Sequence, residues 1–364
     1  MKRAHVSLLV RTELRRRYRS VRGDTRRFAV LVIAGVLLVL PVGALLAGLY
    51  FFGGRVADGS LPGPLSMGTV RGGAAAVLLM VAAITAIRAV QTAAIPSNAD
   101  GVLIMADHSE VVASILIVEA IAGAGIVLVP GALGAVAFGI GSGSALAGGA
   151  FLAAIVCIVA LGSTLGVAIG FAARNALARS ETLSRYRTPA GVALFLGYMY
   201  VIVATDFESA FEPVVGVLGR TPLGWFGDLA LAPLGVGATA SLAGGALAVA
   251  VAGVAALAVA VDRLAALLWY VEPVEGSTGE TDSSGIGGIA GVPLPVARIV
   301  RKTWLRAWRS PIRLLYVVYP LFFVIAPVSE AVRTGVVPRY LPGVIALYGA
   351  WATGAAFGLN PLGD

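Results

Sequence analysis

Apolar residues fill long runs of this chain, and nearly all Lys and Arg residues lie in the gaps between the runs. A helix needs about 20 apolar residues to cross a hydrocarbon core roughly 30 Å thick. Eight runs approach or exceed that length: 28–52, 72–90, 111–129, 147–172, 188–205, 236–261, 312–328 and 342–359. A shorter piece, 132–140, is either an extension of the third helix or a re-entrant segment. The pattern predicts an all-α, polytopic helical membrane protein with about eight transmembrane helices.

Composition and charge agree with this fold class. The chain of 364 residues is 58% hydrophobic and only 13% charged, with a mean hydropathy of +0.91. A water-soluble domain of this size needs more polar surface. The net charge of +8 does not indicate nucleic-acid binding, because most basic residues lie near the ends of apolar runs. There they act as topology signals and contact the headgroups of membrane lipids.

The basic residues also predict an orientation. With the N-terminus in the cytosol, all but five of the 27 Lys and Arg residues fall on the cytosolic side. The five exceptions are Arg55, Arg71, Arg220, Arg333 and Arg339. We therefore expect a multi-pass protein of the cell membrane with a cytosolic N-terminus.

Four segments are expected along the chain. Residues 1–27 form a basic, cytosolic interfacial arm, and 28–270 form a first membrane half of about six spans. Residues 271–296 form a flexible, acidic linker rich in Ser and Gly. Residues 297–364 contain a basic interfacial helix and about two spans, which suggests an incomplete second half.

The two basic segments resemble each other. VRTELRRRYRS begins at Val10, VRKTWLRAWRS begins at Val300, and both precede an apolar run. In each, apolar residues four apart sit among arginines, which is typical of an amphipathic helix at a membrane interface. The similarity is either an internal repeat or chance likeness between two juxtamembrane stretches.

The sequence offers little for catalysis. Lys302 lacks the Gly-rich loop that cradles phosphate, and His5 and His108 are too few and too far apart for a zinc motif. Cys157, the single cysteine, lies inside an apolar run. We expect no catalytic, cofactor-binding or metal-binding residues, and no enzyme activity.

Within the spans, polar and small residues suggest contacts between helices. Glu119 lies deep in the third run, where an unpaired carboxylate is costly. It either lines a path or gate, or it bonds neighbouring helices together. Small residues recur every four positions on the fourth and sixth runs, as expected for closely packed helices. These are Gly162, Gly166 and Gly170, and then Ala240, Gly244, Ala248, Ala252, Ala256 and Ala260.

The gap between the second and third runs reads PSNADGVLIMADHSE over residues 96–110. Ser97, Asn98 and Asp100 can cap a short helix there. Its polar side would carry Asp107, His108 and Glu110. A short helix of this kind suits the docking of a soluble partner, and the alternative is an ordinary connecting loop.

The basic arm, the six spans of one half and the 96–110 segment together resemble a permease subunit of an ABC transporter of the type-two exporter class. The resemblance implies a separate ATP-hydrolysing subunit, a dimer or pseudo-dimer of permease halves, and a coupling helix in the 96–110 segment. The implied partner contacts are Asn98, Asp100, Gly101, Asp107, His108 and Glu110. Two alternatives remain, namely a secondary transporter and a membrane assembly protein without transport.

Overall fold

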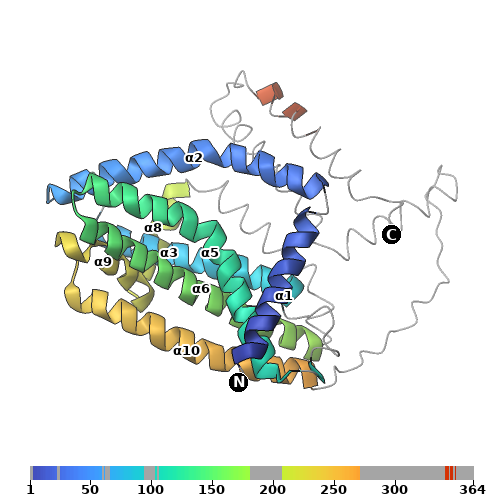
Figure 1. Cartoon of the computed structure of the whole chain (residues 1–364). Helices are drawn as coiled ribbons and strands as arrows, with labels where there is room; N and C mark the ends of the chain where they lie inside the picture. The colour runs from blue at the N-terminus through green and yellow to red at the C-terminus, as the bar shows by residue number, and fades with distance from the viewer. Residues whose placement is uncertain are drawn as a thin grey trace, which may run out of the picture. The chain divides into compact units, whose positions relative to one another are not determined.

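The computed structural model describes residues 3–22, 25–59, 61, 66–93, 103–104, 106–180 and 207–270, with a few positions between 341 and 349. The described part is helical and contains no strand, which confirms the all-α fold class. The α-helices of the described part are α1 (Arg3–Arg22), α2 (Thr25–Ala57), α3 (Met67–Arg88), α5 (His108–Gly141), α6 (Ala145–Arg179), α8 (Phe207–Gly219), α9 (Trp225–Leu231) and α10 (Ala240–Tyr270) (Figure 1).

The chain divides into two compact units. One comprises Met1–Arg179 and Glu212–Pro273, and the other comprises Ser180–Phe211 and Val274–Asp364. Nearly all of the described residues belong to the first unit, and the contacts below all lie within it. The predicted linker, 271–296, lies outside the described residues, so the proposed division into halves stays a prediction.

Five described helical segments are long and apolar enough to cross a membrane. They are Val39–Ala57, Met67–Gln91, His108–Gly125, Ala145–Arg179 and Ala240–Tyr270. They coincide with the first, second, third, fourth and sixth predicted runs, which supports a polytopic membrane protein. The predicted runs 188–205 and 312–328, and most of 342–359, lie outside the described residues.

The helices are longer than the apolar runs that predicted them. Helix α5 continues through Pro130 to Gly141, so 132–140 extends the third helix rather than forming a separate re-entrant segment. A proline is tolerated inside a membrane helix when neighbouring groups satisfy the freed carbonyl. Similarly, α10 continues without a break beyond the sixth predicted run, 236–261, to Trp269 and Tyr270.

Helix α6 is the central helix of this unit and packs against α3, α5, α9 and α10. Its predicted glycine seam faces α3. A Cβ atom on Gly162 would lie 2.9 Å from the carbonyl oxygen of Leu78, and one on Gly166 would lie 2.7 Å from the Cβ of Thr85. Glycine at these positions therefore lets the two backbones approach closely.

The predicted seam on α10 behaves differently. Gly244 has no atom within 4 Å of the place where a Cβ would stand. Most of the seam is exposed within the described part of the chain. Helix α10 buries a different face, which carries Ala243, Ala246 and Ala250.

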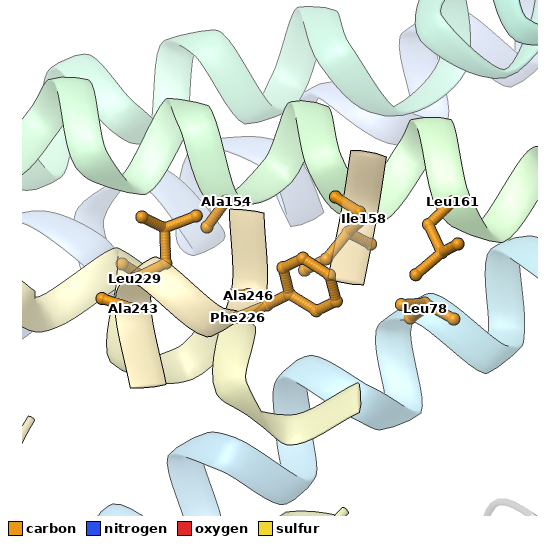
Figure 2. Close-up of a cluster of buried hydrophobic side chains, with 10 residues drawn as sticks. Leu78, Ala154, Ile158, Leu161, Phe226, Leu229, Ala243 and Ala246 are labelled. Carbon is orange, nitrogen blue, oxygen red and sulfur yellow. The ribbon is translucent and has the colours of Figure 1, made fainter. Parts of the chain in front are cut away.

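The short helix α9 completes the core at one end of the unit. Phe226 on α9 is fully buried, in a cluster with Leu78 of α3, Ile158 and Leu161 of α6, and Ala246 of α10. Figure 2 shows these side chains converging from the four helices. This packing holds α9 in place and thereby positions the residue two places further on, Asp228.

Candidate functional site

Polar contacts between helices occur at three levels of the bundle. One set surrounds the first turn of α5, a second joins the middle of α5 to α3, and a third lies at the opposite end, near the start of α3. The first set includes residues that the sequence suggested for partner contact.

Helix α5 begins at His108, directly after Asp107 at the N-cap position. The backbone N–H of Glu110 donates to the carbonyl oxygen of Asp107 at 2.9 Å, which closes the first turn. The side chain of Asp107 makes no capping hydrogen bond and is exposed.

Glu110 ties this turn to α1. Its Oε2 atom lies 3.2 Å from Nδ1 of His5, and Glu110 is only 3% exposed. The contact is a hydrogen bond that becomes an ion pair when the imidazole is protonated. Glu110 therefore faces the protein interior, and a partner could reach it only if this contact opened.

His108 ties the same turn to α10. Its Nε2 atom lies 3.6 Å from Oδ2 of Asp262. Its ring also meets Tyr270 edge to face, with ring centroids 5.7 Å apart. The only two histidines of the chain thus both face carboxylates, and together they connect the start of α5 to two other helices.

The remaining predicted contact residues divide by position. Asn98, Asp100 and Gly101 lie outside the described residues. Just before α5, Leu103 and Ile104 are helical, and Ile104 is 85% exposed. Partner contact by these residues stays a prediction.

Glu119 forms the second contact. It is 2% exposed, and its Oε2 atom accepts a hydrogen bond from Nε of Arg88 at 3.2 Å. Arg88 lies near the end of the second predicted run, and the structure turns its side chain toward α5. The pair compensates charge within the bundle, as a buried carboxylate requires.

The third contact was missed by the sequence analysis. Arg71 donates from Nε to Oδ2 of Asp228 at 2.7 Å and from a terminal nitrogen to Oδ1 at 2.8 Å. Both residues lie outside the predicted apolar runs, but Arg71 lies in α3 and Asp228 lies in α9 with 0% exposure. One signal was available: Asp228 is the only charged residue of the apolar stretch WFGDLAL.

The described residues offer no candidate metal site. Within the described ranges, no group of three or more His, Cys, Asp or Glu side chains could hold a metal ion. The expectation that the protein carries neither metal nor cofactor stays a prediction.

Comparison of the chain with protein-family models, with curated proteins and with solved structures finds no match in any of the three. The class of the protein therefore rests on its own helices. It is an all-α protein with several helices suited to crossing a membrane.

Proposed function

We propose that this protein is the membrane-spanning permease component of an ATP-driven transporter, of the exporting class, with a separate subunit that binds and hydrolyses ATP. The single observation that carries the proposal is the double attachment of the first turn of α5. His5 of α1 contacts Glu110, and His108 contacts Asp262 of α10. A displacement of the 96–110 segment would therefore be transmitted to α5, α1 and α10.

The surface at this position suits a protein partner. Ile104 is 85% exposed, and the exposed carboxylate of Asp107 follows three residues later. An apolar side chain beside polar ones could contribute to a docking surface of mixed polarity, as protein interfaces commonly have. The given sequence contains no phosphate-binding loop, in keeping with the separate ATPase subunit of the proposal.

The orientation is part of the proposal. Arg88, Arg174, Arg179 and Arg263 lie toward the end of the bundle where α5 begins, as does the basic helix α1. The positive-inside rule would place this end in the cytosol, where ATP is available. By the same proposal, the permease works as a dimer or pseudo-dimer of halves.

Cross-linking tests the proposal. In a Cys157→Ser background, Asp107→Cys places one thiol beside the 96–110 segment, and Asp58→Cys places a control thiol after the opposite end of α2. We expect a bifunctional reagent applied to native membranes to join Asp107→Cys, but not Asp58→Cys, to a P-loop ATPase. If neither cysteine captures an ATPase and none co-purifies in mild detergent, the proposal fails.

A secondary transporter is the second candidate, and the Arg88–Glu119 pair favours it. Buried charge pairs in membrane bundles often belong to proton or ion pathways. Uptake driven by an ion gradient in proteoliposomes without ATP, and lost in Glu119→Gln, would support this alternative over the first.

A further inference from the structure

Helix α1 has two faces with different surroundings. Val6 is 8% exposed and lies on the face packed against α5, near the His5–Glu110 contact. On another face, Thr12, Arg15, Arg16 and Arg19 follow the spacing of one side of a helix. All four are exposed.

These four residues line a cavity of about 330 Å³. Arg15 and Arg19 have no ion-pair partner in the part of the chain that the structure describes. Arg16 lies 4.0 Å from Glu13, and the two side chains are 61% and 41% exposed. Such an exposed pair contributes little, so the cavity keeps an excess of positive charge.

The chemistry of the lining indicates an oxyanion ligand. A guanidinium group presents its N–H donors in a planar fork that matches phosphate oxygens. The hydroxyl of Thr12 donates its hydrogen to the carbonyl oxygen of Leu9 at 2.8 Å. It therefore shapes the cavity without adding a donor, and the arginines would supply the hydrogen bonds.

The position of α1 indicates where this oxyanion comes from. Helix α1 packs against α5 near the start of that helix and is drawn at a steep angle to it (Figure 1). This is the orientation expected of a helix that lies along a bilayer surface beside a helix that crosses it. Leu8 and Tyr18 are 61% and 63% exposed on the same helix, and α2 begins only three residues after α1 ends. Apolar and aromatic side chains beside arginines are typical of a helix at the headgroup level.

We propose that Arg15, Arg16 and Arg19 form a binding site for the phosphate group of an anionic phospholipid. The site holds a single headgroup in the cavity on α1, with its acyl chains directed along α2 into the bilayer. This inference is independent of the proposed ATPase partner, because it uses only the charge, the cavity and the placement of α1.

The test compares single variants of the full chain in detergent. Arg15→Gln, Arg16→Gln and Arg19→Gln each remove one charge from the cavity, and Arg11→Gln removes one charge from an exposed position of α1 outside it. Binding of phosphatidylglycerol and phosphatidylcholine is counted by native mass spectrometry. We expect the wild type to retain phosphatidylglycerol preferentially. Each cavity variant should weaken this binding about five-fold, with a smaller effect of Arg11→Gln.

Three outcomes would overturn the proposal. Equal losses from all four variants would indicate diffuse charge attraction without a site. Displacement of phosphatidylglycerol by inorganic phosphate at the same concentration would indicate a free-phosphate site. Unchanged lipid binding combined with loss of a co-purifying protein would assign this face of α1 to a protein partner. Thermal unfolding of each variant, expected to match the wild type, serves as the folding control.

Discussion

Arg71 and Asp228 lie 157 positions apart in the chain and meet in a two-point ion pair. Asp228 is fully buried, and its Oδ1 atom also accepts the backbone N–H of Thr239 at 3.0 Å. Since Thr239 directly precedes α10, one carboxylate connects α3, α9 and the start of α10. This contact explains how a seven-residue helix such as α9 keeps a fixed position.

Removal of the Asp228 carboxylate should therefore destabilise the bundle. Asp228→Ala leaves the guanidinium of Arg71 without its partner, and the loss of one partner of a buried pair costs about 3–5 kcal/mol. The free energy of unfolding in mixed detergent measures this loss. Glu212→Ala removes an exposed carboxylate and should have little effect. Equal stability of the two variants would show that the pair is not a structural contact.

The double variant Arg71→Met/Asp228→Leu replaces both charged side chains of the pair with apolar ones. Because it leaves no uncompensated charge, it should be more stable than Asp228→Ala alone. The single variants Arg71→Met and Asp228→Leu complete the comparison. If the double variant loses as much stability as these two lose in sum, the two residues act independently and the ion pair has no coupling energy.

The close contact between α3 and α6 should not tolerate a larger side chain at Gly166. Gly166→Ala places a methyl group 2.7 Å from the Cβ of Thr85, so the helices must separate, at a cost of about 1–3 kcal/mol. Gly244→Ala is the matched control, since no atom lies within 4 Å of its added Cβ. That variant should be neutral or slightly stabilising, because alanine favours a helix more than glycine does. Comparable losses in the two variants would contradict the packing described.

The Arg88–Glu119 pair predicts an asymmetry between its two partners. The side chain of Glu119 is 1% exposed, whereas that of Arg88 is 37% exposed. Arg88→Met removes the guanidinium that faces a buried carboxylate, while Glu119→Gln leaves a positive charge that reaches solvent or headgroups. Arg88→Met should therefore lower the unfolding free energy more than Glu119→Gln does. The reverse order would show that Glu119 has another source of compensation.

The helices could be predicted because lipid leaves few choices. A backbone in hydrocarbon must satisfy its own hydrogen bonds, so each long apolar run has to be a helix. The ends of the helices were predicted less accurately than their existence. Arg55 and Arg71 looked like loop residues by their charge, yet both are helical in the structure, because a helix can extend beyond the apolar part of its sequence.

Tertiary partners were harder to predict than helices. The sequence left two interpretations of Glu119 open, and it gave no sign that the partner of this carboxylate would be Arg88 of α3. Glu110 looked like part of a polar surface, but its burial depends on α1, whose placement no local pattern specifies. Asp228 lies outside the predicted apolar runs, and its pairing with Arg71 across 157 positions leaves no periodic signal.

If the bundle crosses the membrane as proposed, the start of α5 lies in the cytosol. The most direct measurement is labelling with a membrane-impermeant maleimide in intact cells, using Asp107→Cys and Asp58→Cys in the Cys157→Ser background. Asp58→Cys should react in intact cells, and Asp107→Cys should react only after the membrane is permeabilised. Labelling of Asp107→Cys from outside, or equal access to both positions in intact cells, would contradict the account.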